Sequence, residues 1–242
     1  MNVSLIDYTG YGQPASYAAD ILIFTKSTRL EMKPGLLKEI HDWDEERRNK
    51  ELAYMANTIP SSWEMVNYTF SIEGVSRAFT HQFVRNRQGS YAQQTMRVLD
   101  VGGFEYITGP TIKGDPRLDA LYRTTMNYIE MSYRLLIDKG ASIEDARGIL
   151  PTNIATNITA KYNLRTLSEL ARKRASARVQ EEFRVVLASM VARVLEVHPW
   201  AVHFLAGKKQ KAIKEAHDLL SSLEDKTLLR EIAKRLDLIA ND

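Results

Sequence analysis

Cysteine is absent from all 242 residues of this chain. Its absence excludes disulfide bonds, thiolate metal sites and cysteine nucleophiles, and it fits a reducing compartment. Without covalent or metal crosslinks the fold must rest on its hydrophobic core, and 44% hydrophobic residues can supply one. We therefore expect a cytoplasmic protein that has no metal site and no catalytic thiol.

Long hydrophobic runs are also missing. No segment approaches the roughly 18 consecutive apolar residues that a membrane span needs. The first residues, MNVSLIDYTG, include an acid and lack the basic start and apolar run of a secretion signal. We expect a soluble protein that is not secreted and has no membrane partner.

The chain has little excess charge of either sign. Its 33 basic and 30 acidic residues leave a net charge of +3. Such a balance creates no overall field that would hold a nucleic acid, so we expect none as a partner. Any binding of anions must come from local clusters of basic side chains.

The pattern of apolar, turn and capping residues predicts one α+β domain over residues 1–242, with a small antiparallel sheet packed against long helices. Strands are expected at 3–8, 64–72, 104–107 and 154–162. Helices are expected at 16–24, 33–57, 74–87, 117–139, after Ser142, and at 163–175 and 179–197. We further expect a solvated charged face at 42–50, a polar loop at 88–96, and a charged helical tail at 209–239.

A first arginine cluster follows residue 74. On the expected helix, Gln82 and Arg85 lie on one face beside the apolar stripe of Val75, Phe79 and Phe83. Between Gly74 and Leu99 the chain has four arginines and no carboxylate. The cluster is either a surface paired with acids elsewhere or a binding site for an anionic ligand.

A second cluster lies on the helix expected from residue 163. Positions 163, 167, 170 and 174 share one face, and Leu167 and Leu170 mark that face as buried. Arg174 on a buried face must meet an acid or a bound anion, because an unpaired guanidinium is costly to desolvate. Asn163 lies about 16 Å before Arg174, a span similar to that of a dinucleotide. Arg147 is a further candidate, with a helix C-terminal partner as its alternative role.

The stretch from residue 85 resembles the signature loop of the flavin-dependent thymidylate synthases. The family loop reads Arg-His-Arg, two residues, Ser, one residue, Asn-Glu, one residue, Ser, one residue, Arg. This chain reads RNRQGSYAQQTMR over residues 85–97, so the spacing, the arginines and the first serine match. The family's His, Asn, Glu and second Ser are replaced by Asn86, Ala92, Gln93 and Thr95.

Three more segments carry the same resemblance, which extends over about residues 3–205. Gln82 precedes Arg85 as in the family's Gln-x-x-Arg, and residues 146–151 match its Ala-Arg-x-x-Leu-Pro. Asn163-x-Arg165-x-Leu167 leads to Arg174 and Gln180 at the family spacing. The upstream histidine of the family falls on Ile59, so both usual imidazoles of the site are missing.

The resemblance implies two sets of binding residues, shared between the subunits of a homotetramer. The set implied for FAD is Ser61, Glu64, Arg85, Asn86, Arg87, Gln88, Asn163, Arg165 and Glu169. The set implied for a pyrimidine nucleoside monophosphate is Gln82, Arg85, Gln93, Thr95, Met96, Arg97, Arg147 and Arg174. Guanidinium groups suit both the pyrophosphate and the phosphate. Catalytic roles would fall to Arg174, Gln93 and Thr95, with no covalent role for Thr95.

The implied reaction is transfer of a one-carbon unit to C5 of dUMP, giving dTMP, with methylenetetrahydrofolate as donor and a flavin reduced by NADPH. The replaced motif residues leave alternatives open. One is a diverged enzyme that acts on dCMP or UMP, or that transfers hydroxymethyl. Another is a non-catalytic homologue that binds a nucleotide or RNA.

Overall fold

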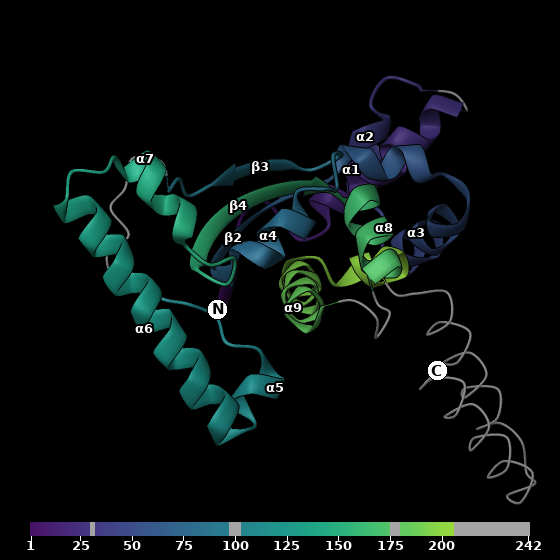
Figure 1. Cartoon of the computed structure of the whole chain (residues 1–242). Helices are drawn as coiled ribbons and strands as arrows, with labels where there is room; N and C mark the ends of the chain where they lie inside the picture. The colour runs from purple at the N-terminus through teal and green to yellow at the C-terminus, as the bar shows by residue number, and fades with distance from the viewer. Residues whose placement is uncertain (30–31, 97–102, 175–179, 206–242) are drawn as a thin grey trace, which may run out of the picture.

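The computed structural model describes residues 1–29, 32–96, 103–174 and 180–205 (Figure 1). The charged segment 209–239 and the candidate Arg97 lie outside the described residues. Within the described part, helices surround a small antiparallel sheet, which confirms the predicted α+β class. No described helix is both long enough and apolar enough to cross a bilayer.

The sheet has four strands in the order β1-β2-β4-β3, all pairing antiparallel. They are β1 (Asn2–Tyr8), β2 (Asn67–Ser76), β4 (Ala155–Asn163) and β3 (Ser90–Gln93). Along β4 every second residue is buried, which is the period expected of a strand with one face on the core. The strands predicted at 3–8 and 154–162 are therefore confirmed within one residue of their ends.

Helices pack on the sheet and at one end of it. They are α1 (Tyr17–Lys26), α2 (Leu36–His41), α3 (Glu45–Thr58), α4 (Arg77–Phe83), α5 (Pro110–Lys113), α6 (Pro116–Asp138), α7 (Ile143–Ala146), α8 (Leu164–Arg174), α9 (Glu181–Val197) and α10 (Val202–Leu205). Helix α9 packs against β1 and β2. Phe79 and Phe83 of α4 stack on each other, and both meet Phe183 of α9 edge to face. This aromatic contact holds the end of α4 in place. Residues 85–89, which we call the arginine loop, follow soon after it.

Gly74 does not open a helix, contrary to the prediction. Strand β2 continues to Ser76, and its register with β4 shifts between Ile72 and Val75. Gly74 has φ +63° there, a conformation that glycine adopts without strain. Helix α4 begins only at Arg77, after Ser76 accepts a hydrogen bond from the backbone N–H of Phe79 as the N-cap.

The strand predicted at 104–107 is also wrong, because only Tyr106 forms an isolated bridge, to Ile154. The polar loop predicted at 88–96 instead contains β3, which pairs with Ile158–Lys161 of β4. The local signal was weak because β3 is a short edge strand without a fully buried residue. Its backbone hydrogen bonds to β4 define it, and its own side chains do not.

The single helix predicted at 33–57 is two helices, since α2 ends at His41 and Asp44 caps α3. Pro34 lies before Gly35, which precedes α2 in a left-handed conformation. The run 42–50 is not only a solvated face. Arg48 donates to Asp20 at 2.6 Å, and Asp20 is 1% exposed and also contacts His41 at 2.8 Å. Arg48 therefore neutralises a buried acid between α1 and α3.

Helix α6 is packed far less than the rest of the fold. It is confirmed as the long helix predicted at 117–139, and Figure 1 shows it set apart from α1, α2 and α3. Only Met126 and Tyr133 are buried among its 23 residues. Its exposed apolar side chains are Leu118, Leu121, Tyr128, Met131, Leu135 and Leu136. The described residues of one chain therefore leave much of the apolar surface of α6 uncovered.

Candidate functional site

A cleft of about 400 Å³ lies where the end of α4 meets the last turns of α8 and the start of α9. The residues after α4 form one wall, and Leu170 and Phe183 supply apolar surface. The polar side chains that line it are Gln82, Arg85, Asn86, Arg87, Gln88, Glu169, Lys173 and Arg174. The cleft thus joins parts of both arginine clusters that the sequence singled out.

A pair of tyrosines holds the wall formed by residues 85–89. The Tyr91 hydroxyl donates to the Asn86 carbonyl at 2.6 Å, so Tyr162 must donate in the 2.7 Å contact between the two hydroxyls. Burial raises the pKa of both tyrosines, so both stay protonated donors. A Cβ at Gly89 would lie 2.7 Å from the Tyr162 ring and from the Tyr91 hydroxyl. The loop therefore rests directly on these two rings.

Positive charge dominates the cleft. Among the described residues, no acid forms an ion pair with Arg85, Arg87 or Arg174, whereas Lys173 contacts Glu169 at 3.5 Å. The guanidinium of Arg174 lies 5.2 Å from the ring centre of Phe183, a cation–π distance. Four cations against one carboxylate suit a ligand that carries phosphate.

Arg174 is half-buried, and the prediction of a buried guanidinium is corrected here. Leu167 and Leu170 of the same face are buried as expected. Helix α8 ends at Arg174, so this side chain reaches the rim of the core and borders the cleft. The cost of desolvating the Arg174 guanidinium is therefore smaller than the sequence implied. The face of the Phe183 ring provides part of the surroundings of this guanidinium.

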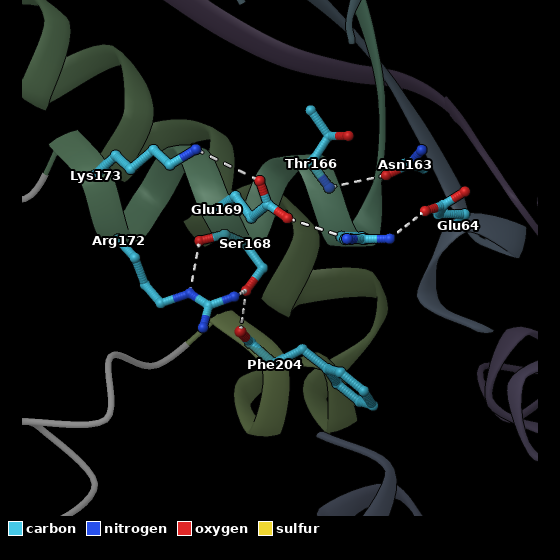
Figure 2. A network of polar contacts seen from close by, with 9 residues as sticks. Glu64, Asn163, Thr166, Ser168, Glu169, Arg172, Lys173 and Phe204 are labelled. Carbon is cyan, nitrogen blue, oxygen red and sulfur yellow. Dashed lines mark hydrogen bonds and ion pairs between the residues drawn. The ribbon is translucent and has the colours of Figure 1, made fainter. Parts of the chain in front are cut away.

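A row of alternating charges runs along the outer side of α8. Arg165 donates to Glu64 at 2.7 Å and to Glu169 at 3.2 Å, and Glu169 reaches Lys173. Figure 2 shows Glu64, Glu169 and Lys173 in this row, which we call the α8 ladder. Its hydrogen bonds to Glu64 and Glu169 raise the pKa of Arg165 above its usual value. The ladder reaches the cleft only through Glu169 and Lys173.

Two other residues implied for the flavin lie beyond the cleft lining. Asn163 is the last residue of β4, and its side-chain oxygen accepts from the N–H of Thr166 at 2.8 Å (Figure 2). It therefore caps α8 and is not part of the helical face on which the sequence placed it. Ser61 is exposed in the 3-10 turn Pro60–Met65, which also carries Glu64.

The residues implied for the nucleotide fall into two groups. Gln82, Arg85 and Arg174 line the cleft, whereas Gln93, Thr95, Met96 and Arg147 do not. The Gln93 amide donates to Thr80 at 2.9 Å, and the Thr80 hydroxyl donates to the Arg77 carbonyl at 3.1 Å. A glutamate at position 93 could not donate to Thr80, so the replaced motif residue suits its buried neighbour.

Arg77 lies near the second group and was not among the predicted site residues. It donates to the Gln94 carbonyl at 2.9 Å, and its buried Nε has no partner within the described structure. Burial and the charge of Arg147 lower its pKa. Arg147 itself donates to the Glu144 carbonyl at 3.2 Å near the end of α7. Within one chain, Arg147 thus has the helix-end role that was the alternative for it.

Lys173 and Phe183 of the cleft, and the tyrosine pair beneath it, were also missed by sequence reasoning. The spacing of Glu169 and Lys173 by four residues would have indicated their contact. No local pattern indicates Phe183 or Tyr162, because each meets Phe83 of α4 through tertiary packing.

Comparison with known proteins supplies a second line of information. Residues 4–200 match the family described as thymidylate synthase complementing protein. A flavin-dependent thymidylate synthase from Nitratidesulfovibrio vulgaris is 34% identical over 209 residues, which cover 81% of this chain and 83% of the relative. One from Clostridium tetani is 31% identical over 216 residues, covering 82% and 84%. One from Sulfolobus acidocaldarius is 40% identical over 136 residues, covering 54% and 51%.

Proposed function

Because this chain belongs to the family of flavin-dependent thymidylate synthases, we propose that it uses a flavin to transfer a one-carbon unit to C5 of dUMP, giving dTMP. The observation that assigns this function to specific residues is the cleft, where Arg85, Arg87 and Arg174 face a shared space and form no ion pair with an acid of the described residues. Such a site suits phosphorylated ligands. The cysteine-free chain fits a cytoplasmic reaction.

The donor set of the cleft fits FAD. Arg85, Arg87 and Lys173 supply cationic donors for its pyrophosphate, and Asn86 and Gln88 supply amides for its polar edges. Glu169 and Arg165 extend this set toward Glu64, Asn163 and Ser61 along the α8 ladder. When bound, the flavin supplies the hydride for reduction of the transferred carbon.

Arg174 is the residue best placed to act on the pyrimidine ring. Its guanidinium borders the cleft, so it can hold the ring and stabilise negative charge that develops on the carbonyl oxygens. Gln82 and Arg85 complete the part of the nucleotide site that one chain provides. Gln93, Thr95, Met96, Arg97 and Arg147 then act on a site completed by another subunit, with Gln93 and Thr95 beside the reacting ring.

A homotetramer is part of this proposal. The uncovered apolar side chains of α6 support it, because a monomeric protein rarely leaves so much apolar surface on one helix. The separation of the two groups of nucleotide residues within one chain also favours sites built between subunits. NADPH as reductant and methylenetetrahydrofolate as carbon donor complete the reaction as we propose it.

A second candidate rests on Gln93 and Ile59. Gln93 replaces a carboxylate and uses its amide on Thr80, and Ile59 stands in the core where the family has a histidine. These changes favour a substrate or carbon unit other than the usual one, namely dCMP, UMP or hydroxymethyl transfer.

Tritium release from C5-labelled nucleotides decides between these candidates. The purified full chain is incubated with FAD, NADPH, methylenetetrahydrofolate and labelled dUMP, dCMP or UMP in parallel. We expect bound flavin and the fastest release from dUMP. Faster release from dCMP or UMP favours the second candidate. A chain that retains no flavin and releases no label, yet still binds nucleotide or RNA, contradicts both and supports a non-catalytic homologue.

A further inference from the structure

A chain of polar side chains links Gln82 to an acid outside the cleft. Gln82 donates from Nε2 to Oε1 of Gln180 at 3.0 Å, and Gln180 donates from Nε2 to Glu182 at 3.3 Å. Glu182 also accepts from the Ser76 N–H at 2.7 Å and from the Ser76 hydroxyl at 2.6 Å. Of these residues only Gln82 lines the cleft. We call Glu182, Gln180 and Gln82 the amide relay.

The chemistry of Glu182 fixes the direction of every hydrogen bond in the relay. An ionised carboxylate only accepts, so Gln180 must present its NH₂ group to Glu182. The Gln180 carbonyl oxygen then faces Gln82, which must present its own NH₂ group in turn. The Gln82 carbonyl oxygen is the atom left for the cleft. This order follows from the acid, because each amide in turn must offer its NH₂ group to the acceptor before it.

Glu182 is held firmly enough to impose this order. Ser76 caps α4. Its hydroxyl oxygen accepts a hydrogen bond from the Phe79 N–H at 3.0 Å, and the same hydroxyl donates a hydrogen bond to Glu182. Both oxygens of the carboxylate are thus used by donors, one from the backbone and two from side chains. Glu182 of α9 thus binds the residue that caps α4, so it cannot turn without breaking its two bonds to Ser76.

The acceptors among the side chains that line this cleft are the amide oxygens of Gln82, Asn86 and Gln88 and the carboxylate of Glu169, and of the three amides the relay orients Gln82. Arg85, Arg87, Lys173 and Arg174 can only donate. The imide edge of a uracil ring presents a carbonyl oxygen, the N3–H donor and a second carbonyl oxygen. A protein site that binds this edge therefore needs an acceptor oxygen between two donors. Guanidinium groups can meet its two carbonyls, and the Gln82 oxygen can meet its N3–H. A cytosine ring has a lone pair at N3, which would oppose that oxygen.

We propose that Glu182, acting through Gln180, sets the Gln82 amide so that its oxygen accepts from an imide N–H, which selects a uracil ring over a cytosine ring. Gln82 is the specificity-determining residue, and Gln180 and Glu182 are its positioning residues. The inference rests on the proposed function, because it assumes that a pyrimidine nucleotide enters the cleft. The flavin ring also contains an imide, and the experiment separates the two sources.

The test compares dUMP with dCMP binding to the full, FAD-loaded chain by calorimetry. Glu182→Gln can donate as well as accept, so the direction of the relay is no longer fixed. We expect the wild type to bind dUMP tighter than dCMP by about tenfold or more, equivalent to about 1.4 kcal/mol. In Glu182→Gln the two dissociation constants should become similar. Glu181→Gln removes the same charge from an exposed neighbouring position and should keep the wild-type ratio.

Two further variants separate the relay from the cap on α4. Ser76→Ala removes the hydrogen bond from the hydroxyl to Glu182 and should lower the stability of the fold. The carboxylate remains an acceptor for Gln180, so the ratio of the dCMP and dUMP dissociation constants should stay as in the wild type. Gln180→Met removes the hydrogen bonds of the relay and leaves the bonds between Ser76 and Glu182. The dissociation constants for dUMP and dCMP should then become similar, with little change in melting temperature. Gln180→Met therefore still tests the proposal if Glu182→Gln does not fold.

The outcomes distinguish failure of this inference from failure of the proposed function. A wild type that binds neither nucleotide overturns the proposed function and the inference with it. A wild type that prefers dUMP, with an unchanged ratio in Glu182→Gln and Gln180→Met, overturns the inference alone. FAD affinity is measured by fluorescence titration of the flavin-free chain. A loss in the relay variants that is confined to FAD assigns the contact to the flavin imide and overturns the assignment to uracil.

Discussion

The cleft and the α8 ladder contain the same kinds of charged side chain but use them differently. In the ladder, Arg165 lies between Glu64 and Glu169, and each guanidinium bond ends on a carboxylate of the same chain. In the cleft, Arg85, Arg87 and Arg174 face a shared space, and no described acid pairs with them. A count of arginines along the sequence does not separate these two situations.

The difference identifies which cations can bind a ligand. A guanidinium that already holds two carboxylates has few donors left, and a phosphate would have to compete for them. A guanidinium without an ion pair, beside apolar surface, gains more from a bound anion, because it has no carboxylate partner to give up. We therefore expect substitutions in the cleft to affect ligand binding strongly and those in the ladder to affect it weakly.

Arg174→Ala should have the largest effect. Loss of one donor to developing charge typically lowers kcat by about a hundredfold to a thousandfold, and we expect a loss of that order in steady-state tritium release from dUMP. The matched control is Arg172→Ala, two residues earlier, where, among the described residues, the guanidinium donates to Ser168 of its own helix alone. Equal losses in the two variants would remove the distinction between cleft and outer surface.

Gly89→Ala should weaken FAD binding by about tenfold or more, because the loop must move off the tyrosine pair. The added Cβ would lie 2.7 Å from Tyr162, whereas a Cβ at Gly148 meets nothing within 4 Å. Gly148→Ala is therefore the control, and fluorescence titration with FAD measures both. If Gly89→Ala binds FAD with the same affinity as the wild type, the position of the arginine loop does not determine FAD binding.

Arg87→Ala and Arg165→Ala compare the two regions directly. Because a hydrogen bond to a charged group contributes roughly 1.5–3 kcal/mol, Arg87→Ala should weaken FAD binding by about tenfold or more. Arg165→Ala should have a smaller effect, about two- to threefold, because Glu64 and Glu169 already occupy its donors. A larger loss in Arg165→Ala than in Arg87→Ala, measured by the same titration, would reverse the comparison.

Glu64→Gln should have the smallest effect. Its pair with Arg165 is exposed, and such pairs contribute about 0–1 kcal/mol to stability. For a chain of this size we expect the melting temperature to fall by less than about 4 °C. Glu181→Gln serves as the control, since Glu181 forms no ion pair within the described residues. A large fall in Glu64→Gln alone would make the ladder a main support of the fold.

Elements with a strong period were predictable from the sequence, and elements defined by a neighbour were not. Strand β4 and helices α6 and α9 carry clear apolar periods, and their predicted bounds lie within two residues of those observed. Strand β3 and the extension of β2 past Gly74 depend on pairing with β4. The break between α2 and α3 follows from the capping of α3 by Asp44.

The candidate site was predictable to the same extent. The family resemblance assigned Arg85 to Gln88 to the flavin and Arg85 and Arg174 to the nucleotide, and the cleft joins these residues. The pairing of Arg165 with Glu64 was not predictable, because the two residues are 101 positions apart in the chain. The amide relay has no local signal either, since Gln82 and Gln180 are 98 residues apart.

A structure of the full chain crystallised with FAD and dUMP tests the account most directly. The account predicts that the phosphate groups of the ligands contact Arg85 and Arg87, that Arg174 contacts the pyrimidine ring, and that Arg165 stays bound to Glu64 and Glu169. Ligands bound away from the cleft, or held by Arg165 while the cleft arginines point into water, would contradict it.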